Sequence, residues 1–158
     1  MRSIIGGGMK HLITILLMAL VAPVMAESEL SDEEAKRAAQ RMATSIEAMQ
    51  GELPGANRDS YQLQIRPKLE ALIKNWPEMN GRNRAIFPYQ ACQQAARDLM
   101  GYADTFFLLS DSADNRQRRE RKKTQFNTAH PECTASIKNP DMSLKEILTE
   151  FDSRSNPE

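Results

Sequence analysis

The chain has 158 residues, enough for one domain, and its 21 basic and 21 acidic residues give a net charge of zero. A neutral total argues against a general nucleic-acid binder, which needs a positive surface to meet the phosphate backbone. Only two cysteines are present, and beyond the first 26 residues there is one histidine, so no zinc site of the usual Cys and His type can be assembled.

The first 26 residues have the pattern of a cleavable secretory signal peptide. Arg2 and Lys10 supply a positive start, and residues 12–21 (LITILLMALV) are all apolar or uncharged. A membrane-spanning helix needs about 20 apolar residues, so this stretch is too short to anchor the chain. Pro23 then breaks the helix before the small residue Ala26. We expect cleavage after Ala26 and a periplasmic location for the mature protein.

The mature chain, residues 27–158, is expected to be a single helical domain with a net charge of −2, because cleavage removes two basic residues. Both cysteines, Cys92 and Cys133, remain in it. In an exported protein such a pair predicts a disulfide, which on the chain-entropy model would stabilise the fold by roughly 4 kcal/mol. The alternative is a pair of buried free thiols.

Two helical segments are predicted in the first half of the mature chain. Residues 30–51 form the first, because Ser31 and Glu34 make a capping box and apolar residues recur at helical spacing. The second runs from about residue 57 to 75, with Pro67 inside it. Pro67 either kinks one helix or begins the second of two shorter ones.

The second half begins with the most apolar segment, residues 88–110, which we expect to be the central helix of the core. Residues 112–126 are helix-prone but contain almost no apolar residues. A loop is predicted at His130–Cys133, tied back to the central helix by the disulfide. Ser143 opens a second capping box and a short helix, and residues 153–158 are expected to be frayed.

No stretch alternates polar and apolar residues with the period of two that a half-buried strand requires. The fold class predicted from the sequence is therefore all-α, a small bundle of four to five helices with one disulfide.

Catalytic residues are sparse. The sequence has no nucleophile elbow, no glycine-rich phosphate loop and no calcium-loop pattern. His130 is interpreted as a surface loop residue without a function. Asp98 and Asp104 stand among apolar neighbours on the central helix, but they are more simply outward-facing or ion-paired. We expect no cofactor, no metal and no enzymatic activity; a carboxylate hydrolase using Asp98, Asp104 or Glu70 is the catalytic alternative.

One basic segment, residues 112–126, has six positive charges within eight positions. They are Arg116, Arg118, Arg119, Arg121, Lys122 and Lys123. At 100° per residue these charges surround the helix, so we expect the segment to project from the bundle or to form a charged hairpin arm. Four arginines favour bidentate pairing with carboxylate or phosphate, and the six are the candidate partner-binding residues. A solvated helix partly neutralised by nearby acidic residues is the simpler alternative.

These features favour an exported periplasmic protein-binding module whose partner is another protein with an acidic surface. An immunity or inhibitor protein that neutralises a toxin in the periplasm is the specific expectation. The alternative is an accessory or chaperone subunit of an envelope secretion or conjugation machine. Nucleic acid is not an expected partner, since no aromatic residues are interleaved with the basic ones for base stacking. The oligomeric state is left open.

Overall fold

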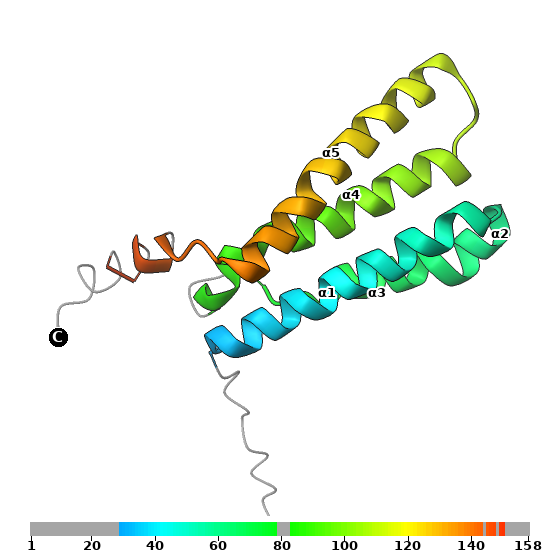
Figure 1. The fold of residues 1–158 in the computed structure, drawn as a ribbon. Helices are drawn as coiled ribbons and strands as arrows, with labels where there is room; N and C mark the ends of the chain where they lie inside the picture. Colours follow the sequence, from blue (N-terminus) through cyan, green and yellow to red (C-terminus); the bar gives the residue numbers. More distant parts are fainter. Residues whose placement is uncertain (1–28, 79–82, 144, 148, 151–158) are drawn as a thin grey trace, which may run out of the picture.

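The computed structural model describes residues 29–78, 83–143, 145–147 and 149–150. Within these ranges every regular element is a helix and no strand occurs, which confirms the predicted all-α fold. Figure 1 shows a hairpin of two long helices, α4 (Gln90–Phe107) and α5 (Ala113–Lys138), lying beside α1 (Asp32–Glu52) and α3 (Arg66–Lys74). The predicted signal peptide and the predicted frayed end lie outside the described residues.

Helix α1 begins at the predicted capping box. The Ser31 hydroxyl accepts a hydrogen bond from the Glu34 backbone N–H, and the Glu34 carboxylate accepts one from the Ser31 backbone N–H. The Ser31 hydroxyl also donates to the Glu34 carboxylate at 2.7 Å, and this bond, together with the one from the Ser31 backbone N–H, holds the pKa of Glu34 below its ordinary value. One face of α1 is buried at the spacing expected from its sequence. The buried residues are Ala35, Ala39, Met42, Ala43, Ile46 and Met49.

The second segment is divided into shorter helical elements, and Pro67 lies in the first turn of the last of them, which is the second of the two predicted alternatives. It consists of α2 (Arg58–Ser60), one π-helical turn (Tyr61–Ile65) and α3, in which Pro67 lies within the first two positions. In the π turn the backbone N–H of Arg66 donates to the carbonyl of Tyr61, five residues back. The wider turn accommodates the proline ring, which has no N–H and would crowd an ordinary α-helical turn.

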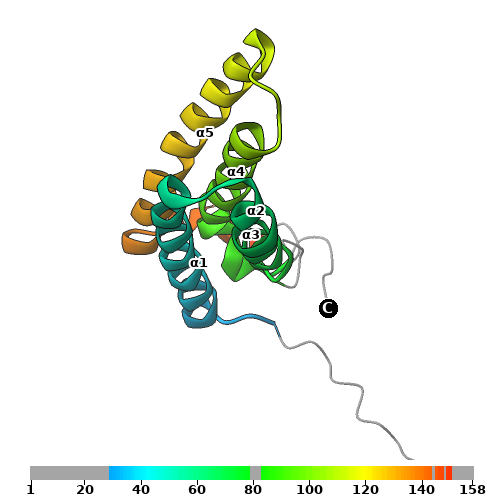
Figure 2. The ribbon, with the colours of Figure 1, turned by 90° about the vertical axis from the view of Figure 1, so that its right-hand side faces the viewer.

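Helix α4 is the centre of the bundle, as predicted, and contacts α1, α3 and α5. Viewed from the end in Figure 2, it lies between α5 and α3. A 3₁₀ turn at Arg84–Tyr89 precedes it, so the α-helix begins later than expected, and it ends at Phe107 instead of Ser110. At that end the Arg58 guanidinium donates a hydrogen bond to the Leu108 carbonyl, 2.9 Å away.

Helix α5 corrects the predicted loop at His130–Cys133. The helix is 26 residues long and continues through Pro131 to Lys138. A proline inside a helix removes one hydrogen bond and opposes the local geometry. Here Phe126, Ala129 and Cys133, which are buried on the face toward α4, compensate for that loss. The packing of this buried face on α4 therefore keeps the segment helical, although Pro131 by itself predicts a loop.

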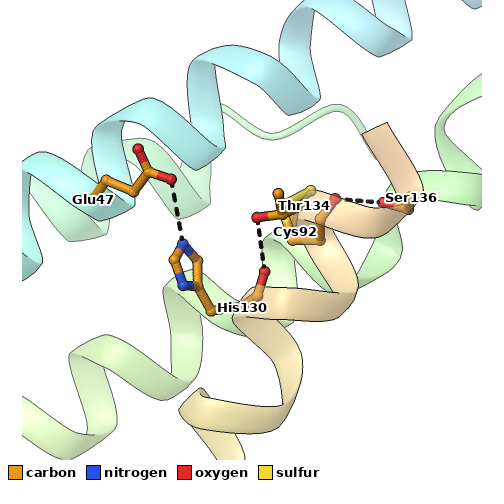
Figure 3. The surroundings of a disulfide bond; sticks show 6 residues. Glu47, Cys92, His130, Thr134 and Ser136 are labelled. Atoms are coloured by element: carbon orange, nitrogen blue, oxygen red, sulfur yellow. Dashed lines mark hydrogen bonds and ion pairs between the residues drawn. A yellow bond between two sulfur atoms is a disulfide. The ribbon is translucent and has the colours of Figure 1, made fainter. Parts of the chain in front are cut away.

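The cysteines form the predicted disulfide, with an S–S distance of 2.08 Å and both residues fully buried. It joins the start of α4 to the end of α5. Figure 3 shows that His130, from α5, lies toward Glu47 of α1. The imidazole Nε2 is 3.9 Å from a Glu47 carboxylate oxygen, and the ring stacks on Phe126. The predicted surface loop residue is thus a half-buried helical one.

The described residues after α5 include a short helical stretch, as expected, but its cap differs from the prediction. The Asp141 carboxylate, not Ser143, is the side-chain acceptor, and it receives the backbone N–H of Ser143 at 3.0 Å. Hydrogen bonding from the Ser143 side chain, and secondly from its backbone N–H, lowers the pKa of Asp141. Lys145 pairs with Asp32 at the start of α1. In the portion of the chain that the structure covers, no helix is both long and apolar enough to cross a bilayer.

Candidate functional site

The face of α5 that meets α4 repeats at intervals of three and four residues, as in a helix packed along a partner. Its members are Asn115, Arg119, Lys122, Phe126, Ala129 and Cys133. The last three are buried and apolar, whereas the first three are polar and half-buried. Of the two predicted arrangements the structure has the hairpin: the basic segment is the N-terminal, polar half of α5, which pairs with α4 in the α4–α5 hairpin.

Arg119, one of the six candidate residues, is held against α4. Its guanidinium donates to the Thr105 carbonyl at 3.2 Å, and its Cζ lies 4.9 Å from the centroid of the Phe106 ring. A terminal nitrogen is 3.9 Å from Asp111. Only 19% of the side chain is exposed. Arg119 thus closes the end of the hairpin and is not a freely presented cation.

Lys122, a second candidate, is paired with Asp98 of α4. The ammonium lies 3.3 Å from the Asp98 carboxylate, which also accepts a hydrogen bond from Gln94 at 2.7 Å. Asp98 itself is only 2% exposed. The Lys122 stem crosses Gly101, where a Cβ atom would stand 3.1 Å from its Cδ. The ion-paired interpretation of Asp98 is confirmed, and the outward-facing one is wrong.

The four remaining candidates lie on the outer surface of α5. Arg116 is tied back to Asp111, donating to its backbone carbonyl and its carboxylate. Arg118, Arg121 and Lys123 are exposed, and among the described residues none of the three forms an ion pair. Arg118 and Arg121 lie on one side of α5, where Arg118 lines a hollow beside Asp104, and Lys123 lies on the other side, in the wall of the cleft described below. We call these three together the outer basic face. They are the cations of the segment that remain available to a partner.

An apolar cleft of about 260 Å³ adjoins this face, between the end of α1 and the α4–α5 hairpin. Figure 1 shows that α5 diverges from α1, so that the two helices are farthest apart at the N-terminal end of α5. We call this apolar cleft the aromatic cleft. Its lining residues are Gln50, Leu53, Pro54, Leu99, Tyr102, Phe106, Phe107, Lys123, Phe126 and Asn127. The sequence did not reveal this cleft, because its walls come from helices whose relative tilt the sequence does not determine.

Asp104 belongs to a polar network on the opposite side of α4. Its carboxylate accepts a hydrogen bond from the buried Tyr61 hydroxyl at 2.6 Å and another from Arg66 at 3.0 Å. Arg66 also pairs with Glu70. Burial, together with the nearby carboxylate, raises the pKa of Tyr61 well above its usual range. The network fixes the π turn and α3 against α4. Two of the carboxylates considered for hydrolysis, Asp104 and Glu70, share the Arg66 guanidinium.

Metal binding has no visible basis in the described ranges, where no group of three or more Cys, His, Asp or Glu residues lies close enough to hold an ion. What the described residues bring together on this side of the molecule is a set of exposed cations beside an apolar cleft. The chain matches no protein-family model, and no curated protein or solved structure shows significant similarity to it.

Proposed function

We propose that this protein is an exported binding module that captures one other protein through the outer basic face, and specifically that it is an immunity or inhibitor protein that neutralises a toxin in the bacterial periplasm. The observation that carries the proposal is a set of three cations on α5, a helix packed on α4, that are exposed and form no ion pair with any described residue: Arg118, Arg121 and Lys123. A rigid surface loses little conformational entropy on binding, and its charge accelerates association with an acidic partner.

The disulfide supports the exported location. Disulfides persist in oxidising compartments such as the periplasm and are rare in the cytosol. Cys92 and Cys133 are bonded and fully buried in the structure. Cleavage after Ala26 and periplasmic residence are the parts of the proposal that follow from the first 26 residues alone.

The size of the aromatic cleft favours an inhibitor over a chaperone subunit. A chaperone needs a long groove that takes a client helix, whereas an inhibitor needs a compact anchor site surrounded by polar groups. The cleft has about 260 Å³, below the 300–1,000 Å³ typical of pockets for drug-sized ligands. Gln50, Lys123 and Asn127 supply polar groups at its walls.

A hydrolase is less well supported. Asp98 is engaged by Lys122 and Gln94, and Asp104 is engaged by Tyr61 and Arg66. These contacts account for both carboxylates as parts of the helix packing.

The proposal is tested with the oxidised mature chain, residues 27–158, as bait in periplasmic extract of the native host. We expect one stoichiometric partner whose toxicity is abolished at a 1:1 ratio. A triple variant, Arg118→Glu, Arg121→Glu and Lys123→Glu, should bind that partner at least about tenfold more weakly, with a flatter dependence on salt.

The matched control changes the same number of exposed charges elsewhere: Arg37→Glu and Arg41→Glu on α1 with Lys74→Glu on α3. It should leave affinity nearly unchanged. A partner that retains full toxicity in the complex, or equal weakening by both triple variants, contradicts the proposal. Recovery of many substoichiometric clients instead of one partner points to the chaperone alternative.

A further inference from the structure

The aromatic cleft leaves part of the bundle's apolar interior uncovered. Phe106 is 52% exposed, although its neighbour Phe107 stacks on the buried Tyr61 ring at 4.8 Å. Tyr102 and Phe126 contribute two further rings to the walls. Aromatic rings gain most from another aromatic or large apolar group placed against them. This lining therefore suits one bulky apolar side chain of a partner.

The polar groups at the cleft have one sign of charge. No acidic residue lines it, and Lys123 is an exposed cation at its wall. The Arg119 guanidinium lies over Phe106 but is engaged by Thr105 and Asp111 and does not line the cleft, so Lys123 is the one charged residue among the lining residues. Gln50 and Asn127 are exposed amides that can donate to and accept from a peptide backbone. An acidic segment fits this surface, whereas a basic one would be repelled.

We infer that the aromatic cleft is the anchor site for an acidic peptide segment of the partner, in which one aromatic side chain packs against Phe106 and a neighbouring carboxylate pairs with Lys123. This inference rests on the proposed function and adds the chemistry of the segment that is bound. The compact volume limits the anchor to a single large side chain, and the cation at the wall sets the charge of its neighbours.

The test uses synthetic peptides as probes of the isotope-labelled mature chain, with NMR chemical shifts of the backbone amides as the readout. The first probe is acetyl-Asp-Glu-Phe-Asp-Glu-amide; the second replaces its Phe by Ala, and the third replaces its four acidic residues by Lys. We expect the first probe to bind in the millimolar range with the largest shifts at Tyr102, Phe106, Lys123 and Asn127. The other two should bind about fivefold or more weakly.

Two variants locate the contacts, each with a matched control. Phe106→Ala and Lys123→Glu should each weaken binding of the first probe by about fivefold or more. Leu63→Ala removes an apolar residue on the π turn that is more exposed than Phe106, 78% against 52%, and Lys138→Glu reverses an exposed charge at the far end of the same helix. Neither control should change the affinity for the probe beyond about twofold.

The inference is overturned if the first probe gives no shifts in the cleft at 5 mM (about the weakest binding such a titration detects), or if the Lys probe binds as well. It is also overturned if Lys138→Glu weakens binding of the probe as strongly as Lys123→Glu. These outcomes leave the proposed function standing, provided that the protein still neutralises the toxin and that charge reversal at the outer basic face abolishes this neutralisation. If the protein fails to neutralise a toxin but binds the peptide normally, the proposed inhibitor function is contradicted and the peptide-binding role of the aromatic cleft stands.

Discussion

Asp98 is 2% exposed on α4, and a carboxylate at such a depth needs both a counter-ion and a hydrogen-bond donor. Lys122 and Gln94 supply them. Lys122 reaches Asp98 only because Gly101, one turn further along α4, has no side chain to obstruct the lysine stem. A lysine that looks like part of a binding surface is therefore used for packing.

Replacing Lys122 by Met should destabilise the fold by about 1–3 kcal/mol, because the Asp98 carboxylate would stay buried without its counter-ion. The loss should fall short of the 3–5 kcal/mol for a fully buried pair, since 34% of the lysine side chain is exposed. Urea unfolding followed by circular dichroism measures the change. Lys123→Met, an exposed control on the same helix, should stay within about 0.5 kcal/mol.

A second variant separates lost charge pairing from lost packing. Adding Asp98→Asn to Lys122→Met removes the orphaned charge, so the double variant should recover part of the stability. Equal stability of Lys122→Met and Lys123→Met would show that the pair contributes nothing.

At the scale of the helix, the sequence predicted where α1 begins and which of its faces is buried, because both signals are local. The course of α5 was not predictable in the same way. Pro131 reads locally as a helix end, yet Phe126, Ala129 and Cys133 continue one buried face across it. The polar half of that face is invisible to hydrophobic periodicity. Arg119 and Lys122 lie on this face because their apolar stems pack on α4 and their charged ends donate hydrogen bonds to acceptors on that helix.

The start of α1 gives a dependence of stability on pH. The Glu34 carboxylate is stabilised in its ionised form by hydrogen bonds from the Ser31 hydroxyl and backbone N–H, so its pKa in the folded state is lowered from its ordinary value. A lowered folded pKa means that the contribution is complete above the unfolded value and is lost as the pH falls through the folded one. Glu34→Gln should therefore lower Tm at pH 7 and have little effect near pH 3.

Thermal melts of both proteins between pH 7 and pH 3 measure this difference. In a Ser31→Ala background the partner hydroxyl is gone, so the same Glu34→Gln change should have a smaller effect at pH 7. A difference in Tm that persists undiminished at pH 3 would argue against the capping box as its source.

The candidate site shows the same division between local and long-range information. The six basic residues were identified from composition, but only the packing of α5 on α4 separates the outer basic face from the residues that are engaged by α4 or Asp111. The aromatic cleft depends on the tilt of α5 away from α1, which no local pattern encodes. Recognition residues on one helix are thus partly predictable, whereas a cleft between helices is not.

Across the whole molecule, the α4–α5 hairpin is closed at both ends. The turn between Phe107 and Ala113 closes one end, and the disulfide between Cys92 and Cys133 closes the other. The disulfide lies beyond Pro131, in the part of α5 where the helix lacks a backbone hydrogen bond. It therefore constrains the half of the hairpin whose helical structure is weakest, and it does so only in an oxidising compartment.

Replacing both cysteines by Ala should lower the free energy of unfolding by about 4 kcal/mol, the chain-entropy value for a loop of this length. That is a large part of the 5–15 kcal/mol by which domains are stable. Urea titrations with and without dithiothreitol measure it: reduction should shift the wild type toward the variant and leave the variant unchanged. Hydrogen exchange should then rise first near Pro131, because that turn loses its clamp while Phe126 stays packed on α4. Uniform acceleration along α5, or a midpoint that reduction does not move, would mean that packing alone holds the hairpin together.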